Sequence, residues 1–419
     1  MNIRYFDNAA TTRIKEEVLE EMFPYLSLEY GNPSSIYGLG RRSKKAIETA
    51  RGRVASLLNC KPSEITFTSC GSESDNMALK GMAMLQKSKG TGKNHIITSK
   101  IEHPAILNSC HSLEKLGFKI TYLDVDKEGF VNLDTLINSI TDKTFLISVM
   151  YANNEIGTIQ PISKIAKIAK AHNIIFHTDA VQAVGNVPID VKRLGVDMLS
   201  LSGHKLYAPK GIGAIYIKEG LEIERFLDGG HQEKNRRSGT ENVAEIVGLG
   251  KACNIAQYDM SSYINKLKYF RDYFINQIRQ KFPNCHINGS LEQRLPGNCN
   301  LCFENINSGE LLLKLDAVGI CASGGSACSS GDTAPSHVLS AIGVPNDLAK
   351  GALRITFGDF NTFEDVEFLI KSLEEILKSW CFLSPSPKTS LYRILSTFYS
   401  INSRSHNTTS ITSAFTARK

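Results

Sequence analysis

The sequence predicts an α/β protein whose main domain is a seven-stranded, mainly parallel sheet with helices on both faces. Seven short runs rich in β-branched residues fall between residues 64 and 217, and such runs are typical of strands. Most are separated by segments whose apolar residues recur three and four positions apart, which predicts helices. Strands that alternate with helices form parallel sheets, and these sheets carry their sites at the carboxyl ends of the strands.

The expected elements follow one another along the chain. The seven expected strands are "EITFT", "NHIITS", "KITYLDV", "TFLISVMYA", "IIFHTDA", "DMLSLSG" and "GIGAIYI". Two of the expected covering helices are "SDNMALKGMAML" and "PISKIAKIAKAH". After the last strand come two long helical patterns, around 241–258 and 261–281, and then a mixed α+β region to about residue 380.

This order predicts a large domain over residues 1–258 and a smaller α+β domain over 259–383. We expect the first 12 or so residues to pack on the smaller domain. Residues 384–419 contain fifteen Ser/Thr and few periodic apolar positions, which predicts a disordered tail.

The charge of the chain gives no indication of a nucleic-acid surface. The formal net charge is +6, but residues 384–419 hold five Lys/Arg and no Asp/Glu, so the remainder has 43 basic against 42 acidic residues. A nearly neutral body is not expected to attract nucleic acid. The sequence begins without an apolar signal core, and no run approaches the roughly 18 apolar residues of a membrane span. We therefore expect a cytoplasmic protein that does not associate with membranes.

Ten cysteines are scattered irregularly along the chain. A long chain without a signal peptide is not expected to use them as a disulfide framework. One pair, Cys299 and Cys302 of "CNLC", has a spacing that also occurs in zinc sites. Its surroundings alternate like a strand, which would point the two thiols to opposite faces. The sequence therefore predicts no structural metal site here.

The strongest chemical signal is an Asp and a Lys at the ends of neighbouring expected strands. Asp179 ends "IIFHTD", and Lys205 follows the next strand in "SLSGHK". Pyridoxal phosphate needs a lysine for its aldehyde, a carboxylate for its ring nitrogen and a donor-rich cup for its phosphate. Gly71 and Ser72 lie between a strand and a helix, where backbone N–H groups favour a phosphate. Each piece alone also fits a helix cap, a turn or a solvated lysine.

At this point the sequence resembles the NifS/IscS-type cysteine desulfurases, class-V aminotransferase relatives within the fold-type I pyridoxal-phosphate enzymes. The resemblance runs from about residue 3 to 381. Its motifs, in the family's order, are "YFDNAATT", "GNPSS", "TSCGSESDN", "EHPA", "YANNEIGT", "HTDAVQAVG", "SLSGHKLYAPKGIGA", "GGHQEKNRRSGTEN", "SGGSACSSG" and "LRITFG".

The resemblance implies a role for each matching residue around the cofactor ring. Lys205 would hold the cofactor's aldehyde and act as the base, and Asp179 would pair with the ring nitrogen. His103 of "EHPA" would stack on the ring. Gln182 would contact the ring's phenolic oxygen, and Asn154 would lie beside both ring and substrate.

The resemblance also implies the phosphate and substrate contacts. Arg354 would hold the substrate carboxylate with a bidentate pair. The phosphate would be bound by residues of one subunit together with Thr240 of a second subunit. The resemblance therefore implies a homodimer. The residues of the first subunit would be Gly71, Ser72, Ser202 and His204. Two plainer alternatives stay open: His103 as a residue that starts a helix, and Arg354 as a structural ion pair.

Cys328 lies in "ASGGSACSSG", a run of small residues that neither packs a core nor favours a helix. In the family this loop carries the cysteine that takes sulfur from L-cysteine, leaving alanine and a persulfide. Two positions depart from the usual pattern, Gly324 for a serine and Ser72 for a frequent threonine, and neither removes a reacting group. By contrast, Cys321 in "VGICA" is expected to be an unreactive strand residue.

The implied enzyme is a sulfurtransferase that supplies an iron–sulfur scaffold protein, which could serve nitrogenase, or another sulfur acceptor. Cys328 would bind a cluster only transiently, on the scaffold partner. The alternatives are a selenocysteine lyase-like or aminotransferase-like enzyme with the same cofactor, or a non-enzymatic scaffold, which the intact reacting groups disfavour. "HTDAVQAVG" and "GGHQE" look closer to the NifS branch, and the choice between branches stays open.

Overall fold

The structure is a computed structural model that describes residues 3–324 and 336–381. Cys328 and the Ser/Thr-rich tail therefore lie outside the described residues. The chain divides into a compact unit over Met1–Ser372 and a second that begins at Leu373, inside the last helix. The features below belong to the first unit, and the domain boundaries expected from the sequence stay predictions.

All seven expected strands are present, in one sheet of order β2-β8-β7-β6-β5-β3-β4. Neighbouring strands are parallel except β8, which is antiparallel to both β2 and β7. The fold predicted from the sequence is thus confirmed, with its one antiparallel strand inside the sheet. The strands are β2 (Ile65–Thr68), β3 (His95–Ser99), β4 (Lys119–Leu123), β5 (Thr144–Ser148), β6 (Ile175–Asp179), β7 (Met198–Ser202) and β8 (Gly213–Ile217).

Both faces of this sheet are buried because successive side chains of a strand point to opposite sides. In β3, Ile96 packs in one apolar cluster with residues of α3 and α4, whereas Ile97 packs in a second cluster with residues of α2, α6 and α8. Leu146 and Ile147 of β5 divide in the same way. Strands with two buried faces read as continuous apolar runs, which explains why the sequence predicted them well.

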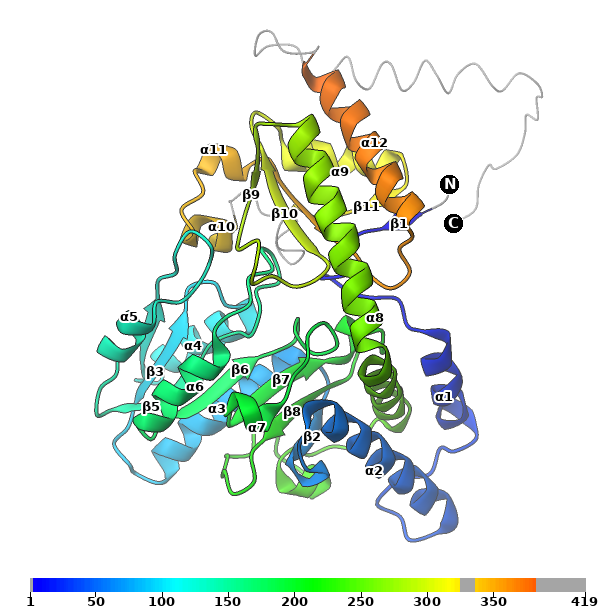
Figure 1. The fold of residues 1–419 in the computed structure, drawn as a ribbon. Coiled ribbons are helices and arrows are strands. Elements are labelled where there is room, and N and C mark those ends of the chain that lie inside the picture. The colour runs from blue at the N-terminus through cyan, green and yellow to red at the C-terminus, as the bar shows by residue number, and fades with distance from the viewer. Residues whose placement is uncertain (1–2, 325–335, 382–419) are drawn as a thin grey trace, which may run out of the picture. The chain divides into compact units, whose positions relative to one another are not determined.

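Helices surround the sheet and continue beyond it (Figure 1). In chain order they are α1 (Glu16–Ser27), α2 (Gly38–Leu58), α3 (Gly71–Ser88), α4 (Pro104–Glu114), α5 (Leu133–Asn138), α6 (Ile162–Ala171), α7 (Val191–Leu194), α8 (Val243–Lys281), α9 (Ser308–Ala317), α10 (His337–Ala341), α11 (Asn346–Ala349) and α12 (Phe363–Cys381). Short 3₁₀ helices are η1 (Pro62–Glu64), η2 (Gly203–Lys205) and η3 (Gln232–Asn235).

One expectation about the helices is wrong. The two patterns at 241–258 and 261–281 form the single helix α8, so Asp259 lies inside a helix and not between two. The run "DMSS", where the two patterns meet, contains neither Pro nor Gly, and the helix continues through it. Helix α8 packs against α1 and α2 in its first part and reaches β10 further along, as Figure 1 shows.

Two smaller sheets involve the rest of the unit. Strands β12 (Ala352–Thr356), β10 (Asn298–Phe303) and β9 (Cys285–Ile287) are antiparallel, whereas β1 (Arg4–Tyr5) is parallel to β11 (Ile320–Cys321). Strand β1, near the start of the chain, thus pairs with β11, whose residues Ile320 and Cys321 come far later in the sequence.

Eight cysteines are free thiols, namely Cys60, Cys70, Cys110, Cys253, Cys285, Cys299, Cys302 and Cys321. Cys299 and Cys302 both lie in β10 and are fully buried. Within residues 3–324 and 336–381, no group of His, Cys, Asp and Glu is arranged to hold a metal ion. No helix in the same ranges is long and apolar enough to cross a membrane.

Candidate active site

Ten of the twelve residues predicted for the site line one cavity of about 240 Å³. The cavity lies where β2, β3, β5, β6 and β7 end, because nine of the ten residues close one of these strands or follow it in the next loop or helix start, whereas Arg354 comes from β12. This is the edge at which α/β sheets bind ligands. The ten residues are Gly71, Ser72, His103, Asn154, Asp179, Gln182, Ser202, His204, Lys205 and Arg354.

Lys205 ends η2, directly after β7. Its Nζ donates hydrogen bonds to the carbonyl oxygens of Ala9 and Ala10, at 2.6 and 2.7 Å. The side chain is only partly buried, and it lines the cavity. The N-terminal segment therefore holds the amine of Lys205 beside the cavity.

The backbone at Tyr207, two residues after Lys205, is strained and is held by a hydrogen-bond network. Tyr207 has a φ of 64°, a left-handed conformation that is uncommon for a bulky side chain. Its hydroxyl lies 3.0 Å from the hydroxyl of Tyr263 and accepts a 2.7 Å hydrogen bond from the Asp359 N–H. Its own N–H donates to the Thr12 hydroxyl at 2.8 Å. Strain at a residue is maintained only where its neighbours fix it, so this network fixes the turn that carries Lys205.

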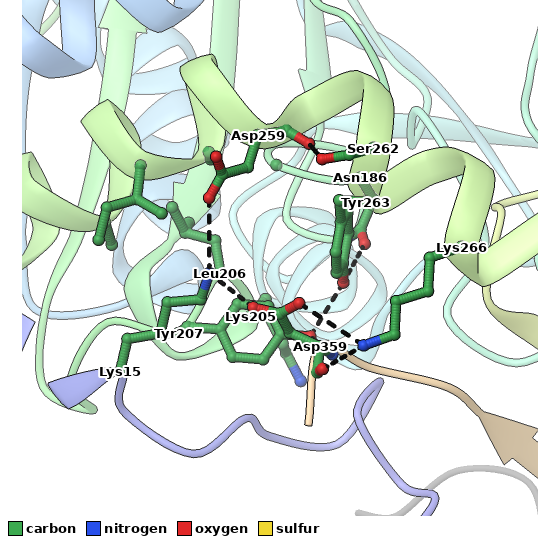
Figure 2. Close-up of a pocket in the computed structure, with 14 residues that line it drawn as sticks. Lys15, Asn186, Lys205, Leu206, Tyr207, Asp259, Ser262, Tyr263, Lys266 and Asp359 are labelled. Atoms are coloured by element: carbon green, nitrogen blue, oxygen red, sulfur yellow. Dashed lines mark hydrogen bonds and ion pairs between the residues drawn. The ribbon is translucent and has the colours of Figure 1, made fainter. Parts of the chain in front are cut away.

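This network borders a second cavity, of about 310 Å³, which Lys205 also lines. Figure 2 shows Tyr207 and Tyr263 close to Asp359. The ammonium groups of Lys15 and Lys266 both reach Asp359, with Lys15 at 2.6 Å from its carboxylate. Lys15 and Lys266 of this second cavity thus both contact Asp359, and Lys205 is the one predicted site residue among those that line it.

Asp179 is a buried carboxylate at the end of β6. One of its oxygens, Oδ1, accepts a hydrogen bond from the Val181 N–H at 2.9 Å. Burial raises the pKa of Asp179, while His103 and Lys205 act in the opposite direction. A buried carboxylate of this kind is stabilised as an anion by a cationic partner. A protonated ring nitrogen in the cavity would be such a partner.

His103 supports both of its sequence interpretations. It is the N-cap of α4, and its Nδ1 accepts a hydrogen bond from the Ala105 N–H at 3.1 Å. Its ring also lines the cavity. Burial lowers the pKa of His103, so at neutral pH we expect a neutral ring that carries its proton on Nε2. A neutral aromatic ring is suited to stacking on another ring.

The start of α3 provides polar groups for an anion. Cys70, the N-cap, makes no side-chain hydrogen bond to the first turn, and Gly71 and Ser72 of that turn line the cavity. The first backbone N–H groups of a helix favour an anion. A Cβ on Gly71 would lie 2.6 Å from the Val181 side chain, so a larger residue here would have to displace that side chain. Nearby, the Ser202 hydroxyl is buried and has no hydrogen-bond partner among the described residues. A phosphate oxygen is an acceptor that would satisfy it.

His204 lies in the same cavity as the start of α3 and Ser202, and it is a further polar side chain that could contact an anion. Its Nδ1 lies 3.1 Å from the Thr11 hydroxyl. Burial, and then the charges of Lys205 and Lys210, lower the pKa of His204 to about 4. His204 is therefore neutral at neutral pH and can donate one N–H.

Arg354 also supports both of its interpretations. It forms an ion pair with Asp7, with Nη2 and Oδ1 at 2.7 Å, and Nη1 donates to the Asn154 carbonyl at 3.1 Å. It also lines the cavity, although only 1% of its surface is exposed. Its buried Nε has no hydrogen-bond partner within residues 3–324 and 336–381. The ion pair thus exists, and one donor of the guanidinium has no partner among the described residues.

The other two predicted residues are not placed in this cavity. Cys328 lies outside the described residues. Thr240 is exposed and lines a separate cavity of about 150 Å³ together with Arg237. Arg237 forms an ion pair at 2.8 Å with Glu73, in the first turn of α3.

The structure adds groups that the sequence analysis missed. Asp75 lines the cavity and is fully buried, and burial together with the charge of Asp179 raises the pKa of Asp75. Helical spacing from Gly71 could have placed it on the same face of α3. The contacts of the Ala9 and Ala10 carbonyl groups could not be predicted from the sequence, because every residue has a backbone carbonyl.

Comparison with known proteins matches this chain to one family. The family model described as Aminotransferase class-V matches residues 4–369. A protein of Dictyoglomus turgidum named "Cysteine desulfurase IscS" is 51% identical over 381 residues, which are 91% of this chain and 96% of the relative. A protein of Methanosarcina thermophila with the same name is 52% identical over 93% of this chain and 96% of its own.

Solved structures agree with these relatives. A structure titled "NifS-like protein" is 40% identical, covers 90% of this chain and all of its own, and has a TM-score of 0.84. Another, titled "SspA in complex with cysteine", is 37% identical, covers 86% of this chain and all of its own, and has a TM-score of 0.73. The two relatives carry the name IscS, and the first structure carries the name NifS-like. These names do not distinguish the NifS branch from the IscS branch for this chain. The chain belongs to the class-V aminotransferase family and, within it, to the NifS/IscS-type cysteine desulfurases.

Proposed function

We propose that this enzyme converts L-cysteine to L-alanine and leaves the sulfur as a persulfide on Cys328. The observation that carries the proposal is the single cavity that collects nine predicted site residues from five strand ends and Arg354 from β12. The reaction balances without an oxidant: the Cβ–S bond of cysteine breaks as an S–S bond to Cys328 forms, and the substrate carbon takes up a proton. Equal amounts of L-alanine and of reductant-released sulfide from L-cysteine would support it, and alanine without sulfide would contradict it.

Pyridoxal 5′-phosphate fits the residues of this cavity. Lys205 would hold its aldehyde carbon and Asp179 its ring nitrogen. The start of α3 and the buried Ser202 hydroxyl, which lacks a partner among the described residues, would hold its phosphate. When bound, the cofactor supplies an electron sink next to the Cα of the amino acid.

The remaining steps belong to side chains of the chain itself. Arg354 would bind the substrate carboxylate, and Asn154 lies at the same wall of the cavity. The amine of Lys205 would take the Cα proton and later return a proton to the Cβ carbon. The thiolate of Cys328 would attack the substrate sulfur, because a thiolate is the reactive form of cysteine.

Replacing Asp179 with alanine is expected to weaken cofactor binding and to slow turnover of L-cysteine by about 10²-fold or more. This loss is similar in size to the loss of a general acid–base group. The reason is that the ring nitrogen would lose the anion that keeps it protonated. Titration of the purified protein with pyridoxal phosphate, followed by a sulfide assay at saturating cofactor, measures both effects. Turnover at the wild-type rate would show that Asp179 has another role.

We propose that the enzyme acts as a homodimer in which Thr240 contacts the phosphate of the other subunit. Thr240 is exposed and lies apart from the cavity of its own chain. In addition, α1 and the segment after it expose large apolar side chains, namely Phe23, Leu26, Leu28, Tyr30 and Ile36. Such surfaces mark protein contacts.

Thr240→Ala is expected to retain the dimer and to weaken cofactor affinity a few-fold, as the loss of one hydrogen bond would. Light scattering at micromolar concentration and cofactor titration test the two parts separately. A wild-type protein found only as a monomer would contradict the proposed dimer.

The sulfur acceptor is proposed as an iron–sulfur scaffold protein or another thiol-bearing partner. The names of the relatives support this proposal at the level of the family only. A pull-down from cells with the full chain, followed by transfer of labelled sulfur from L-cysteine to the captured partner, tests it.

A further inference from the structure

Arg354 lies buried in β12 with its guanidinium held on two sides. Nη2 pairs with Oδ1 of Asp7 at 2.7 Å, and Nη1 donates to the Asn154 carbonyl at 3.1 Å. Nε is buried without a hydrogen-bond partner within the described ranges. The two contacts fix the plane of the guanidinium, so its direction toward the cavity is set before a ligand arrives.

Asp7 is itself held in place by the small sheets. The Phe6 N–H donates to the Cys321 carbonyl at 2.8 Å, and the Phe6 carbonyl accepts from the Thr356 N–H at 2.7 Å. The Tyr5 hydroxyl lies 3.0 Å from the backbone oxygen of Asp7 and donates to it. The Asp7 side chain is 16% exposed. Its carboxylate can therefore orient a partner with little freedom of its own.

The residues after Asp7 continue along the same cavity. The carbonyl of Ala9 accepts hydrogen bonds from Lys205 and from Gln182, the latter at 3.0 Å. The Thr11 hydroxyl lies 3.1 Å from His204. Within five residues the segment thus contacts Arg354 and three further residues that line the cavity.

A buried guanidinium also needs a counter-charge. Removing one partner of a buried ion pair leaves the other charge uncompensated, which is costly. Asp7 supplies the compensating charge at Nη2, whereas the Asn154 carbonyl contacts Nη1. A ligand carboxylate would then meet a guanidinium whose orientation is already fixed, which reduces the ordering cost of binding.

We propose that Asp7 is a positioning residue that orients Arg354 for the α-carboxylate of the amino-acid substrate. The inference rests on the proposed function, since it takes Arg354 as the group that binds the substrate carboxylate. Asp7 acts only through Arg354 in this proposal and takes no part in proton or sulfur transfer.

The test compares two ligands that differ in the carboxylate. Dissociation constants of L-alanine and ethylamine are measured for the pyridoxal-phosphate-loaded full chain, from the change in cofactor absorbance. Asp7→Ala is expected to weaken L-alanine binding about tenfold, as loss of a charged hydrogen bond would, and ethylamine binding by less than about twofold. Asp7→Asn keeps an acceptor oxygen in the same place and is expected to retain most of the L-alanine affinity.

Two further variants separate positioning from general damage. Asp365→Asn breaks the neighbouring ion pair with Arg4, at 3.1 Å, which lies outside the cavity, and should change neither ligand. In the Arg354→Ala background, Asp7→Ala should cause no additional loss of L-alanine affinity, because residues that act through one another are not additive. In steady-state assays, Asp7→Ala should raise KM for L-cysteine about tenfold and change kcat by less than about threefold.

The outcomes distinguish this inference from the proposed function. If the wild type binds L-alanine no better than ethylamine, the role proposed for Arg354 is wrong. If the wild type prefers L-alanine and Asp7→Ala keeps that preference, only the inference about Asp7 is overturned. An equal loss for both ligands, or full additivity with Arg354→Ala, would also overturn it. If Asp7→Ala does not fold, Asp7→Asn decides: a loss of L-alanine affinity of about two- to threefold with an unchanged affinity for ethylamine supports the inference, and an L-alanine affinity equal to that of the wild type contradicts it.

Discussion

Replacing Lys205 with alanine is expected to abolish covalent cofactor binding and to lower turnover of L-cysteine by at least about 10³-fold. The loss is large because one amine serves twice, as the group that holds the cofactor and as the base for the Cα proton. In the structure this amine is fixed beside the cavity by the carbonyls of Ala9 and Ala10. No described neighbour that lines the cavity carries another primary amine.

The Lys205 prediction can be checked without an activity assay. Treating the wild type with borohydride should attach the cofactor permanently, and peptide mapping should find it on the peptide that contains Lys205. Lys210→Ala is the matched control, because Lys210 is exposed and lies five residues later outside the cavity. A label on another lysine, or a Lys205→Ala protein that keeps the visible absorbance of the wild type, would contradict the assignment.

Cys328→Ala is expected to stop sulfide release while the protein still binds L-cysteine. Binding depends on Lys205 and the cavity, whereas sulfur transfer requires the thiolate. The absorbance of the cofactor-loaded protein should therefore change on addition of L-cysteine, although no persulfide forms. Sulfide release at the wild-type rate would contradict the proposed role of Cys328.

Cys321→Ala is the matched control, seven residues earlier in the chain. Cys321 lies in β11, where it pairs with Tyr5 of β1. Burial, together with the charges of Asp316 and Asp7, raises the pKa of the Cys321 thiol. A higher pKa leaves less thiolate at neutral pH. Its replacement should leave turnover within a few-fold of the wild type.

The described residues on either side of 325–335 contact the wall of the cavity. Ser323 exchanges two backbone hydrogen bonds with Arg354, at 2.6 and 3.3 Å. On the other side, Nε2 of His337 lies 3.0 Å from the carbonyl oxygen of Glu102, which precedes His103. Ser323 thus contacts a residue that lines the cavity, and His337 contacts the residue that precedes His103.

Most of the fold could be predicted from the sequence because its signals are local. Each strand of the large sheet is a short apolar run, and each of its site residues follows one of these runs directly. The continuity of α8 could not be predicted, since "DMSS" resembles the start of a helix and only packing against α1 and α2 shows otherwise.

The candidate site was predicted less completely, for a physical reason. Asp179 and Lys205 are reactive side chains at strand ends, and their residue types point to the chemistry. Asp7 and the carbonyl of Ala9 contact residues far along the chain, Asp7 reaching Arg354 and Ala9 reaching Lys205. Such contacts depend on how distant segments pack, and nothing in the local sequence records them.

The most direct test of this account is to locate the sulfur. The full chain, loaded with pyridoxal phosphate, is incubated with L-cysteine without reductant, and its peptides are analysed by mass spectrometry. The account predicts one additional sulfur atom on the peptide that contains Cys328, and none when Lys205 is replaced by alanine. Additional sulfur on the peptides of Cys321 or of Cys299 and Cys302 instead, or alanine formed with no sulfur on Cys328, would contradict it.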